Sequence, residues 1–159
     1  MKSEALIATL ALAALSASPG SAGCTAANDA ACEIDGGTYH IALPEGSEVP
    51  LPAVLFLHGW GSSGANAIAN DRISPSILER GYAFIAPDGM PRSNGNGRTW
   101  SFHPDWPEAR DEVAFLQEVI ADAAEKYGID PEQVILSGFS IGGSMTAYAA
   151  CVSPEAFDA

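Results

Sequence analysis

Three short, continuously apolar runs, separated by segments of helical character, limit the folds that this chain can adopt. The runs cover residues 52–58, 82–86 and 133–138. Apolar residues at consecutive positions are typical of strands that helices cover on both faces. Strands and helices that alternate along a chain form parallel sheets with right-handed crossovers. The sequence therefore predicts an α/β fold, a three-layer sheet with helices on both faces.

Helix signals fill the segments between these runs. Residues 66–80 are predicted to be helical with a break at Pro75, because proline starts a new turn more readily than it continues one. A long amphipathic helix is predicted to begin at a capping box of Asp105 and Glu108 and to end at Gly128. A third helix follows the last apolar run.

Other segments frame this core. Residues 37–43 alternate apolar and polar side chains and predict a half-exposed strand. Residues 88–104 are rich in glycine, asparagine and proline and predict an exposed loop without regular structure. Asp130 and Pro131 predict a short turn before the third strand. No internal repeat and no second domain is indicated.

The N-terminus has the three parts of a secretory signal peptide. Lys2 precedes an apolar run at 5–17 and a stretch of small residues, which predicts a signal peptide over 1–22 and a mature domain over 23–159. The run is shorter than the roughly 20 apolar residues of a membrane-spanning helix. We therefore expect a secreted or periplasmic protein without a stable membrane anchor; the alternative is that the run forms a buried helix.

Three cysteines fit an oxidising compartment. Cys24 and Cys32, eight positions apart, could close a small disulfide loop. Cys151 is then left over, either as a buried free thiol or as the partner of a cysteine beyond this chain. The net charge of −13 argues against nucleic acid and anionic membranes as partners, because both bind basic patches.

Ser140 is the candidate catalytic nucleophile. Residues 138–142 match the pattern G-x-S-x-G, in which serine occupies a tight turn between a strand and a helix. The pattern alone is common, but here an apolar strand precedes the serine directly and a helix of small residues follows it. This context is the one that the chemistry requires, because the turn exposes the hydroxyl above the sheet.

A second motif predicts the oxyanion hole. The sequence HGWG lies at 58–61, at the end of an earlier strand. Enzymes with a G-x-S-x-G turn place a loop there that donates one backbone amide to the oxyanion. Trp60 is the first choice for this donor and Gly61 the second. The backbone amide of Ile141 would supply the other hydrogen bond.

These motifs together resemble those of a known group of enzymes. The segments HGWGSSG, TWSFHPDW, DEVAFLQEVI and DPEQVILSGFSIGGSM resemble the secreted polyhydroxybutyrate depolymerase and feruloyl or acetylxylan esterase group of the α/β-hydrolase superfamily, over residues 36–159. The resemblance implies a serine esterase that forms an acyl-enzyme on an ester-bearing polymer or carbohydrate. It implies no metal and no organic cofactor.

An aromatic loop is a candidate substrate surface. Trp100, Phe102, His103 and Trp106 could line the acyl or aromatic-ester site, and packing within the loop is the competing interpretation.

The remainder of a catalytic triad is not evident. In α/β-hydrolases the acid and the histidine follow the serine, yet His40, His58 and His103 all precede Ser140. His58 is interpreted as a structural part of the oxyanion loop, His103 as a loop residue and His40 as exposed. We therefore expect the N-terminal part of a catalytic domain that lacks its C-terminal strands and is inactive alone.

Three acidic residues were considered as the acid of a catalytic triad, but the sequence supports none of them. Asp111 and Glu112 fall in the first turn of a helix, where the helix dipole favours carboxylates, so capping and solubility explain them without catalysis. Asp88 precedes a glycine in a turn, and no role is assigned to it.

Two other functional classes stay open. The chain could be a non-catalytic half-domain or binding module, or it could be a hydrolase of the prolyl-oligopeptidase or dienelactone type, although the latter uses cysteine where this chain has Ser140. The ester itself stays open among polyhydroxyalkanoates, feruloylated xylan and acetylated sugars.

Overall fold

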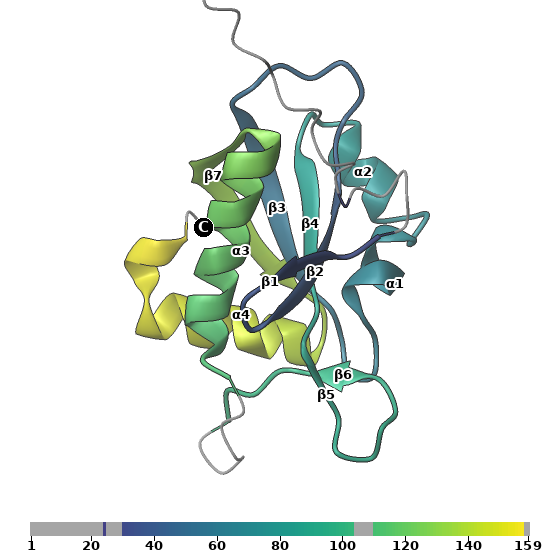
Figure 1. Ribbon diagram of the computed structural model, residues 1–159, viewed down its shortest axis with the longest axis vertical. Coiled ribbons are helices and arrows are strands. Elements are labelled where there is room, and N and C mark those ends of the chain that lie inside the picture. Colours follow the sequence, from purple (N-terminus) through teal and green to yellow (C-terminus); the bar gives the residue numbers. More distant parts are fainter. Residues whose placement is uncertain (1–23, 25–29, 104–109, 158–159) are drawn as a thin grey trace, which may run out of the picture.

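A five-stranded sheet forms the centre of the protein (Figure 1). The computed structural model describes Cys24, residues 30–103 and residues 110–157. The strands follow the spatial order β1-β2-β4-β3-β7. Their bounds are Cys32–Ile34 (β1), Gly37–Ala42 (β2), Leu51–Leu57 (β3), Ala83–Pro87 (β4) and Ile129–Gly138 (β7).

The three apolar runs form the parallel part of this sheet, as the sequence predicts. Leu55 of β3 pairs with Ile85 of β4 on one side and with Leu136 of β7 on the other, both in parallel register. The earlier strand β2 runs antiparallel to β4, and β1 forms a hairpin with β2. The carboxyl ends of β3, β4 and β7 therefore meet at one edge, where sites of α/β sheets assemble.

Helices lie on both faces of the sheet (Figure 1). The longer pair, α3 (Glu112–Tyr127) and α4 (Ile141–Val152), covers one face and encloses the larger core. The shorter pair, α1 (Gly64–Ile68) and α2 (Ser74–Leu78), packs on the other face. Successive side chains of β4 point to opposite faces of the sheet, so Ile85 belongs to the larger core and Phe84 to the smaller one.

The two faces are covered unequally: β4 is buried on both faces, as expected, whereas for β3 and β7 the expectation of burial on both faces is wrong. Every second residue of β3 is buried under α3 and α4, whereas Val54 and Phe56 on the other face are only partly buried. Ile135 of β7 is 41% exposed. The cause is length: α1 and α2 have five residues each and pack against β2 and β4.

The ends of α3 follow local sequence signals. The Asp111 side chain caps the helix by accepting a hydrogen bond from the Ala114 amide, at 3.0 Å. Gly128 ends the helix in a left-handed conformation with φ of 69°, as predicted. The predicted capping box of Asp105 and Glu108 lies outside the described residues.

Two segments differ from their predictions. The loop at 88–104 contains a small antiparallel hairpin, β5 (Met90–Pro91) with β6 (Arg98–Thr99). The predicted turn at Asp130 and Pro131 is part of β7, which pairs with β3 across an irregularity between Leu51 and Ala53. A bulge accommodates proline within a strand, because the proline there need not donate to the ladder.

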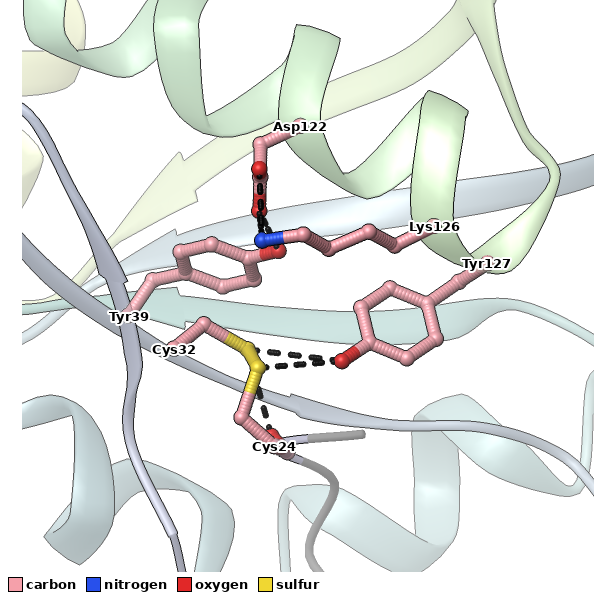
Figure 2. Close-up of a disulfide and its surroundings, with 6 residues drawn as sticks. All are labelled: Cys24, Cys32, Tyr39, Asp122, Lys126 and Tyr127. Carbon is pink, nitrogen blue, oxygen red and sulfur yellow. Dashed lines mark hydrogen bonds and ion pairs between the residues drawn. A yellow bond between two sulfur atoms is a disulfide. The ribbon is translucent and has the colours of Figure 1, made fainter. Parts of the chain in front are cut away.

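A disulfide joins Cys24 to Cys32, the first residue of β1 (Figure 2). The Tyr127 hydroxyl, at the end of α3, donates to the Cys24 sulfur at 3.0 Å. Beside it, Tyr39 donates to Asp122 at 2.6 Å, and Asp122 also pairs with a lysine one turn later in α3. These contacts fix the hairpin of β1 and β2 against α3.

The structure describes Cys151, near one end of the chain, but not the predicted signal peptide at the other. Cys151 has a free thiol that is exposed on α4, which corrects the interpretation that it is buried. The predicted signal peptide lies outside the described residues. No helix in the described part of the chain combines the length and apolar character needed to cross a membrane.

Removal of the disulfide tests how far it stabilises the fold. We expect the double variant Cys24→Ser and Cys32→Ser to lose about 2 kcal/mol of unfolding free energy, because the open chain gains conformational entropy in the unfolded state. Urea denaturation followed by circular dichroism measures the loss. The exposed Cys151→Ser is the control and should unfold like the wild type; equal stability of the double variant and this control would contradict the prediction.

Candidate active site

Ser140 occupies the sharp turn between β7 and α4. Its φ of 55° and ψ of −121° make it the only non-glycine residue with positive φ in the described part of the chain. A non-glycine residue persists in such a conformation only where its surroundings impose it, and this strain is characteristic of the nucleophile elbow. The residue is exposed, and its hydroxyl makes no hydrogen bond among the described residues.

Two glycines make the turn sterically feasible. A Cβ on Gly142 would lie 2.1 Å from the Leu57 carbonyl oxygen, and one on Gly138 would lie 2.5 Å from the backbone of Gly142. The first turn of α4 therefore packs directly on the end of β3. This contact brings Ser140 next to the loop that follows β3.

The two residues whose backbone amides are the predicted oxyanion donors lie beside Ser140. Ile141 is the first residue of α4, one of the positions whose amide has no acceptor within its own helix. Across the turn lies Trp60, in the loop after β3. The Gly61 amide donates to the Arg98 carbonyl at 2.9 Å, so this second choice for the loop donor is already engaged.

His58 is a buried support of this loop. Its Nε2 accepts a hydrogen bond from the Gly89 amide at 3.0 Å, which places the ring proton on Nδ1, 2.9 Å from the Gly59 carbonyl. Burial lowers the pKa of His58, opposed by the Gly59 carbonyl and by Asp88. The ring is therefore neutral, and both nitrogens are used by the backbone.

Trp100 lies beneath the same loop rather than on the surface. It is fully buried, its Nε1 donates to the His58 carbonyl at 2.9 Å, and its ring lies 5.1 Å from the His58 ring. The proposed role as a substrate-lining residue thus does not match its position, because a large ring in the core has no surface to offer.

Asp88 connects three segments around the site, although the sequence assigned it no role. Its Oδ1 accepts from the Gly64 amide at the start of α1, and its Oδ2 accepts from the Thr38 hydroxyl of β2, both at 2.8 Å. Arg98 of β6 lies 3.4 Å away, and His40 lies 3.7 Å away. His40 is therefore partly buried beside a carboxylate, which corrects its interpretation as exposed.

The surroundings of Asp88 favour its ionised form. Burial raises the pKa of this carboxyl, but hydrogen bonds from His40, the Gly64 amide and Thr38, together with the Arg98 charge, outweigh burial and lower the pKa to about 2. Asp88 therefore acts as a fixed negative charge that holds the start of α1, and with it the end of the oxyanion loop.

Glu112 also differs from its interpretation as a solvating residue at a helix start. It is buried and pairs with Arg110 at 2.6 Å, and it accepts from the Ser101 amide at 2.8 Å. Burial raises the pKa of Glu112, and the Arg110 charge opposes this effect. Arg110 also donates to the Asp88 carbonyl, so this pair connects α3 to the loop after β4.

The remaining predicted lining residues are not among the walls of the pocket that contains Ser140, or they lie outside the described part. Phe102 packs on the core and its ring lies 5.7 Å from that of Tyr148 on α4, while His103 is exposed. Trp106 lies outside the described residues.

A pocket that the sequence did not predict lies directly beside Ser140. Its volume is about 280 Å³, and its walls include Trp60, Phe139 and Asn66. The sequence predicts no role for Phe139, the residue before the serine, beyond its place in the G-x-S-x-G pattern. Because the pattern leaves this position unspecified, only the adjacent oxyanion loop could have suggested that Phe139 faces a pocket.

Neither a base nor a metal site is present in the described residues. No histidine there forms a hydrogen bond with Ser140, and His58 has both nitrogens engaged. Within the same residues, no cluster of histidine, cysteine, aspartate and glutamate could hold a metal ion. Among the described residues, Ser140 therefore has no hydrogen-bonded histidine that could accept its proton.

Substitution of Gly142 tests the packing of the elbow. We expect Gly142→Ala to lower the unfolding free energy by about 3 kcal/mol, because its Cβ would collide with the Leu57 carbonyl. The neighbouring Gly143→Ala is the matched control, since its Cβ would lie 3.3 Å from the nearest atom. Its stability should change by about 1 kcal/mol or less. Urea denaturation compares the two, and similar losses would refute the assignment.

Acid sensitivity tests the role of Asp88. Its native pKa of about 2 lies below its usual value of 3.8, so the unfolded chain binds the proton more readily. The stabilisation, about 2 kcal/mol, is complete above about pH 5 and is lost as the pH falls towards 2. Urea denaturation from pH 6 to pH 2 should show a smaller decline for Asp88→Asn than for wild type. The exposed Glu118→Gln should keep the wild-type decline; an unchanged decline in Asp88→Asn would contradict the role.

Comparisons with known proteins agree with this geometry. Residues 39–158 match the family described as Phospholipase/Carboxylesterase. The chain is 26% identical over 128 residues to feruloyl esterase B of Piromyces equi. This alignment covers 74% of this chain and 23% of that protein. It is 28% identical over 136 residues to probable feruloyl esterase C of Aspergillus niger, and this alignment covers 80% of this chain and 46% of that protein.

A solved structure has the same fold. The acetyl xylan esterase from Aspergillus awamori superposes with a TM-score of 0.64 at 21% identity, over 78% of this chain and 45% of that one. The chain thus spans less than half the length of each of these three proteins. The family match covers the sheet from β2 onwards, the elbow and the oxyanion loop, and the chain belongs to the phospholipase/carboxylesterase family of α/β-hydrolases.

Proposed function

We propose that this chain carries the nucleophile and the oxyanion hole of a serine esterase. The observation that carries the proposal is the strained backbone of Ser140 at the N-terminus of α4, next to the loop after β3. In the proposed reaction the Ser140 oxygen attacks an ester carbonyl carbon. The resulting oxyanion accepts hydrogen bonds from the amides of Ile141 and Trp60, each worth about 3 kcal/mol of the barrier.

The reaction then passes through an acyl-enzyme. Collapse of the tetrahedral intermediate expels the alcohol, which takes up a proton, and leaves the acyl group on Ser140. Water then attacks this acyl group and releases the acid, which restores the serine hydroxyl. Both steps need a group that accepts and returns a proton, because serine at its ordinary pKa is a weak nucleophile.

We propose that this group belongs to a longer polypeptide of which this chain is the N-terminal part. In α/β-hydrolases an acid and then a histidine follow the serine. Two observations support the proposal: the chain spans 46% of the Aspergillus niger relative, and β7 forms an edge of the described sheet with Ile135 exposed. An unpaired apolar edge is unfavourable for an isolated domain.

The proposed substrate is an ester on a carbohydrate or another polymer, and the proposed location is outside the cytoplasm. Two relatives that match most of this chain are named feruloyl esterases. A polyhydroxyalkanoate is the alternative polymer. The apolar run at 5–17 and the Cys24–Cys32 disulfide support export, because disulfides persist in oxidising compartments.

Covalent labelling tests the nucleophile. We expect a fluorophosphonate to label the full-length product and Ser140→Ala to abolish the labelling, because only an activated serine reacts. Ser144→Ala, one turn further along α4, is the matched control and should label like the wild type. Mass spectrometry of the labelled peptide identifies the site, and labelling that persists in Ser140→Ala would overturn the proposal.

The 159-residue chain provides a second measurement. We expect it to hydrolyse simple aryl esters at a negligible rate, because its described residues supply no base to Ser140. Translation of the reading frame beyond the Ala159 codon should reveal an aspartate and then a histidine. A natural stop codon there, or esterase activity of the short chain, would contradict the division proposed.

A further inference from the structure

A hairpin outside the elbow contacts the backbone of the oxyanion loop. Its strands β5 and β6 lie beyond the carboxyl end of β4, and residues 92–97 join them (Figure 1). The Gly61 amide donates to the Arg98 carbonyl at 2.9 Å. Gly97 lies against the same loop residue, because a Cβ at this position would come within 2.2 Å of the Gly61 carbonyl oxygen. The hairpin and the loop thus meet backbone to backbone.

These contacts hold the two peptide groups that flank Trp60. The Gly61 N–H belongs to the same planar group as the Trp60 carbonyl, and its hydrogen bond to Arg98 fixes that group. The Gly59 carbonyl belongs to the same group as the Trp60 N–H, and it accepts from Nδ1 of His58 at 2.9 Å. In a trans peptide the C=O and N–H bonds point in opposite directions. The direction of the Trp60 N–H, the proposed oxyanion donor, is therefore set by contacts of the residues on either side of it.

The side chain of Arg98 anchors the hairpin on the end of β4. Its Nε lies 3.4 Å from Oδ1 of Asp88, and its guanidinium donates to the Gly89 carbonyl at 3.1 Å. Strand β6 also packs closely on this turn, since a Cβ on Gly89 would lie 2.4 Å from the Thr99 carbonyl oxygen. Arginine suits this position because its planar guanidinium makes several directed contacts at once. The Arg98 carbonyl that receives the Gly61 amide is therefore fixed relative to the sheet edge.

Two glycines in the hairpin have the same backbone conformation but different surroundings. Gly95 and Gly97 have φ of 74° and 73°, a region that residues with a side chain rarely adopt. Apart from its chain neighbours, no described residue lies within 4 Å of a Cβ at Gly95, whereas a Cβ at Gly97 would collide with the backbone of Gly61. The conformation of the turn alone therefore explains glycine at 95. At 97 the close contact with the oxyanion loop is a second requirement.

We infer that the β5–β6 hairpin is a positioning element of the oxyanion hole, in which Gly97 and Arg98 hold the Trp60 amide in the direction that the oxyanion requires. Neither residue is among the walls of the pocket that contains Ser140, so both act through Gly61. The inference rests on the proposed esterase function. Because the oxyanion forms only in the transition state, a misplaced donor lowers kcat and leaves KM nearly unchanged. A hairpin that only stabilised the fold would not separate these two quantities.

A matched pair of alanine substitutions in the full-length product tests the inference. For hydrolysis of 4-nitrophenyl acetate, we expect Gly97→Ala to lower kcat about 100-fold, the effect of removing one oxyanion donor, with KM changed less than about threefold. Gly95→Ala imposes the same backbone strain away from the loop, and it should keep kcat within about twofold of the wild type. Urea denaturation of both variants measures the cost in stability separately, so that a loss of rate is not confused with a loss of folded protein.

Two substitutions of Arg98 keep the test decisive if Gly97→Ala does not fold. Arg98→Ala removes the anchor on Asp88 and Gly89, and we expect about a tenfold loss of kcat. Arg98→Lys keeps the charge opposite Asp88 and should recover most of this loss. In the 159-residue chain, hydrogen exchange gives a readout that needs no activity. The Gly61 amide should exchange about tenfold faster in Arg98→Ala than in the wild type, while the amides of β3 keep their protection.

The outcomes separate this inference from the proposed function. Wild-type kcat in Gly97→Ala, or equal losses of kcat in Gly97→Ala and Gly95→Ala, would overturn the inference. So would wild-type kcat in Arg98→Ala or unchanged exchange of its Gly61 amide. The esterase proposal survives these results as long as Ser140→Ala abolishes hydrolysis. A folded wild type that hydrolyses no aryl ester would instead refute the proposed function, and the positioning role with it.

Discussion

The contact between Gly142 and the end of β3 is the constraint on which the rest of the site depends. Because no side chain separates α4 from the Leu57 carbonyl, the helix starts directly above the neighbouring strand. The turn before the helix must then be tight, which forces Ser140 into its strained conformation with positive φ. The same close approach places the first amide of α4 beside the oxyanion loop. One absent side chain thus sets the positions of Ser140, the proposed nucleophile, and of the Ile141 amide, the proposed oxyanion donor.

The oxyanion loop is held by its neighbours and not by its own sequence alone. His58 reaches Gly89 in the loop after β4, and Asp88 holds the start of α1. Trp100 closes the arrangement from beneath. These polar contacts are buried, where a lost partner costs more than a made bond contributes. The loop therefore depends on strands β2, β3 and β4 together, so its geometry is a property of the whole sheet edge.

Much of the fold follows from local signals in the sequence. Three features were predictable from apolar runs, a glycine and a spacing: that β3, β4 and β7 run parallel, that α3 ends at Gly128 and that Cys24 pairs with Cys32. Ser140 was predictable as the turn residue because a strand and a helix flank it directly.

The parts that the sequence did not reveal depend on contacts between distant segments. Asp88 is 50 residues from Thr38 and 24 from Gly64, and a local pattern shows only a turn there. Trp100 was expected at a surface because its loop is polar, but its ring fills the space under His58. The partly buried face of β3 was not predicted either, because an apolar run does not indicate how long the covering helices are.

The cation–π contact between Arg92 and Trp60 gives the β5–β6 hairpin a part in the evolution of this site. Hairpin loops accept substitutions and changes of length more readily than strands or elbows do. A change in this hairpin would move one wall of the pocket while the elbow, Gly142 and the α4 amides stay in place. Related proteins could diverge in what they accept without any change at Ser140, and a library confined to the residues between β5 and β6 would sample that divergence directly.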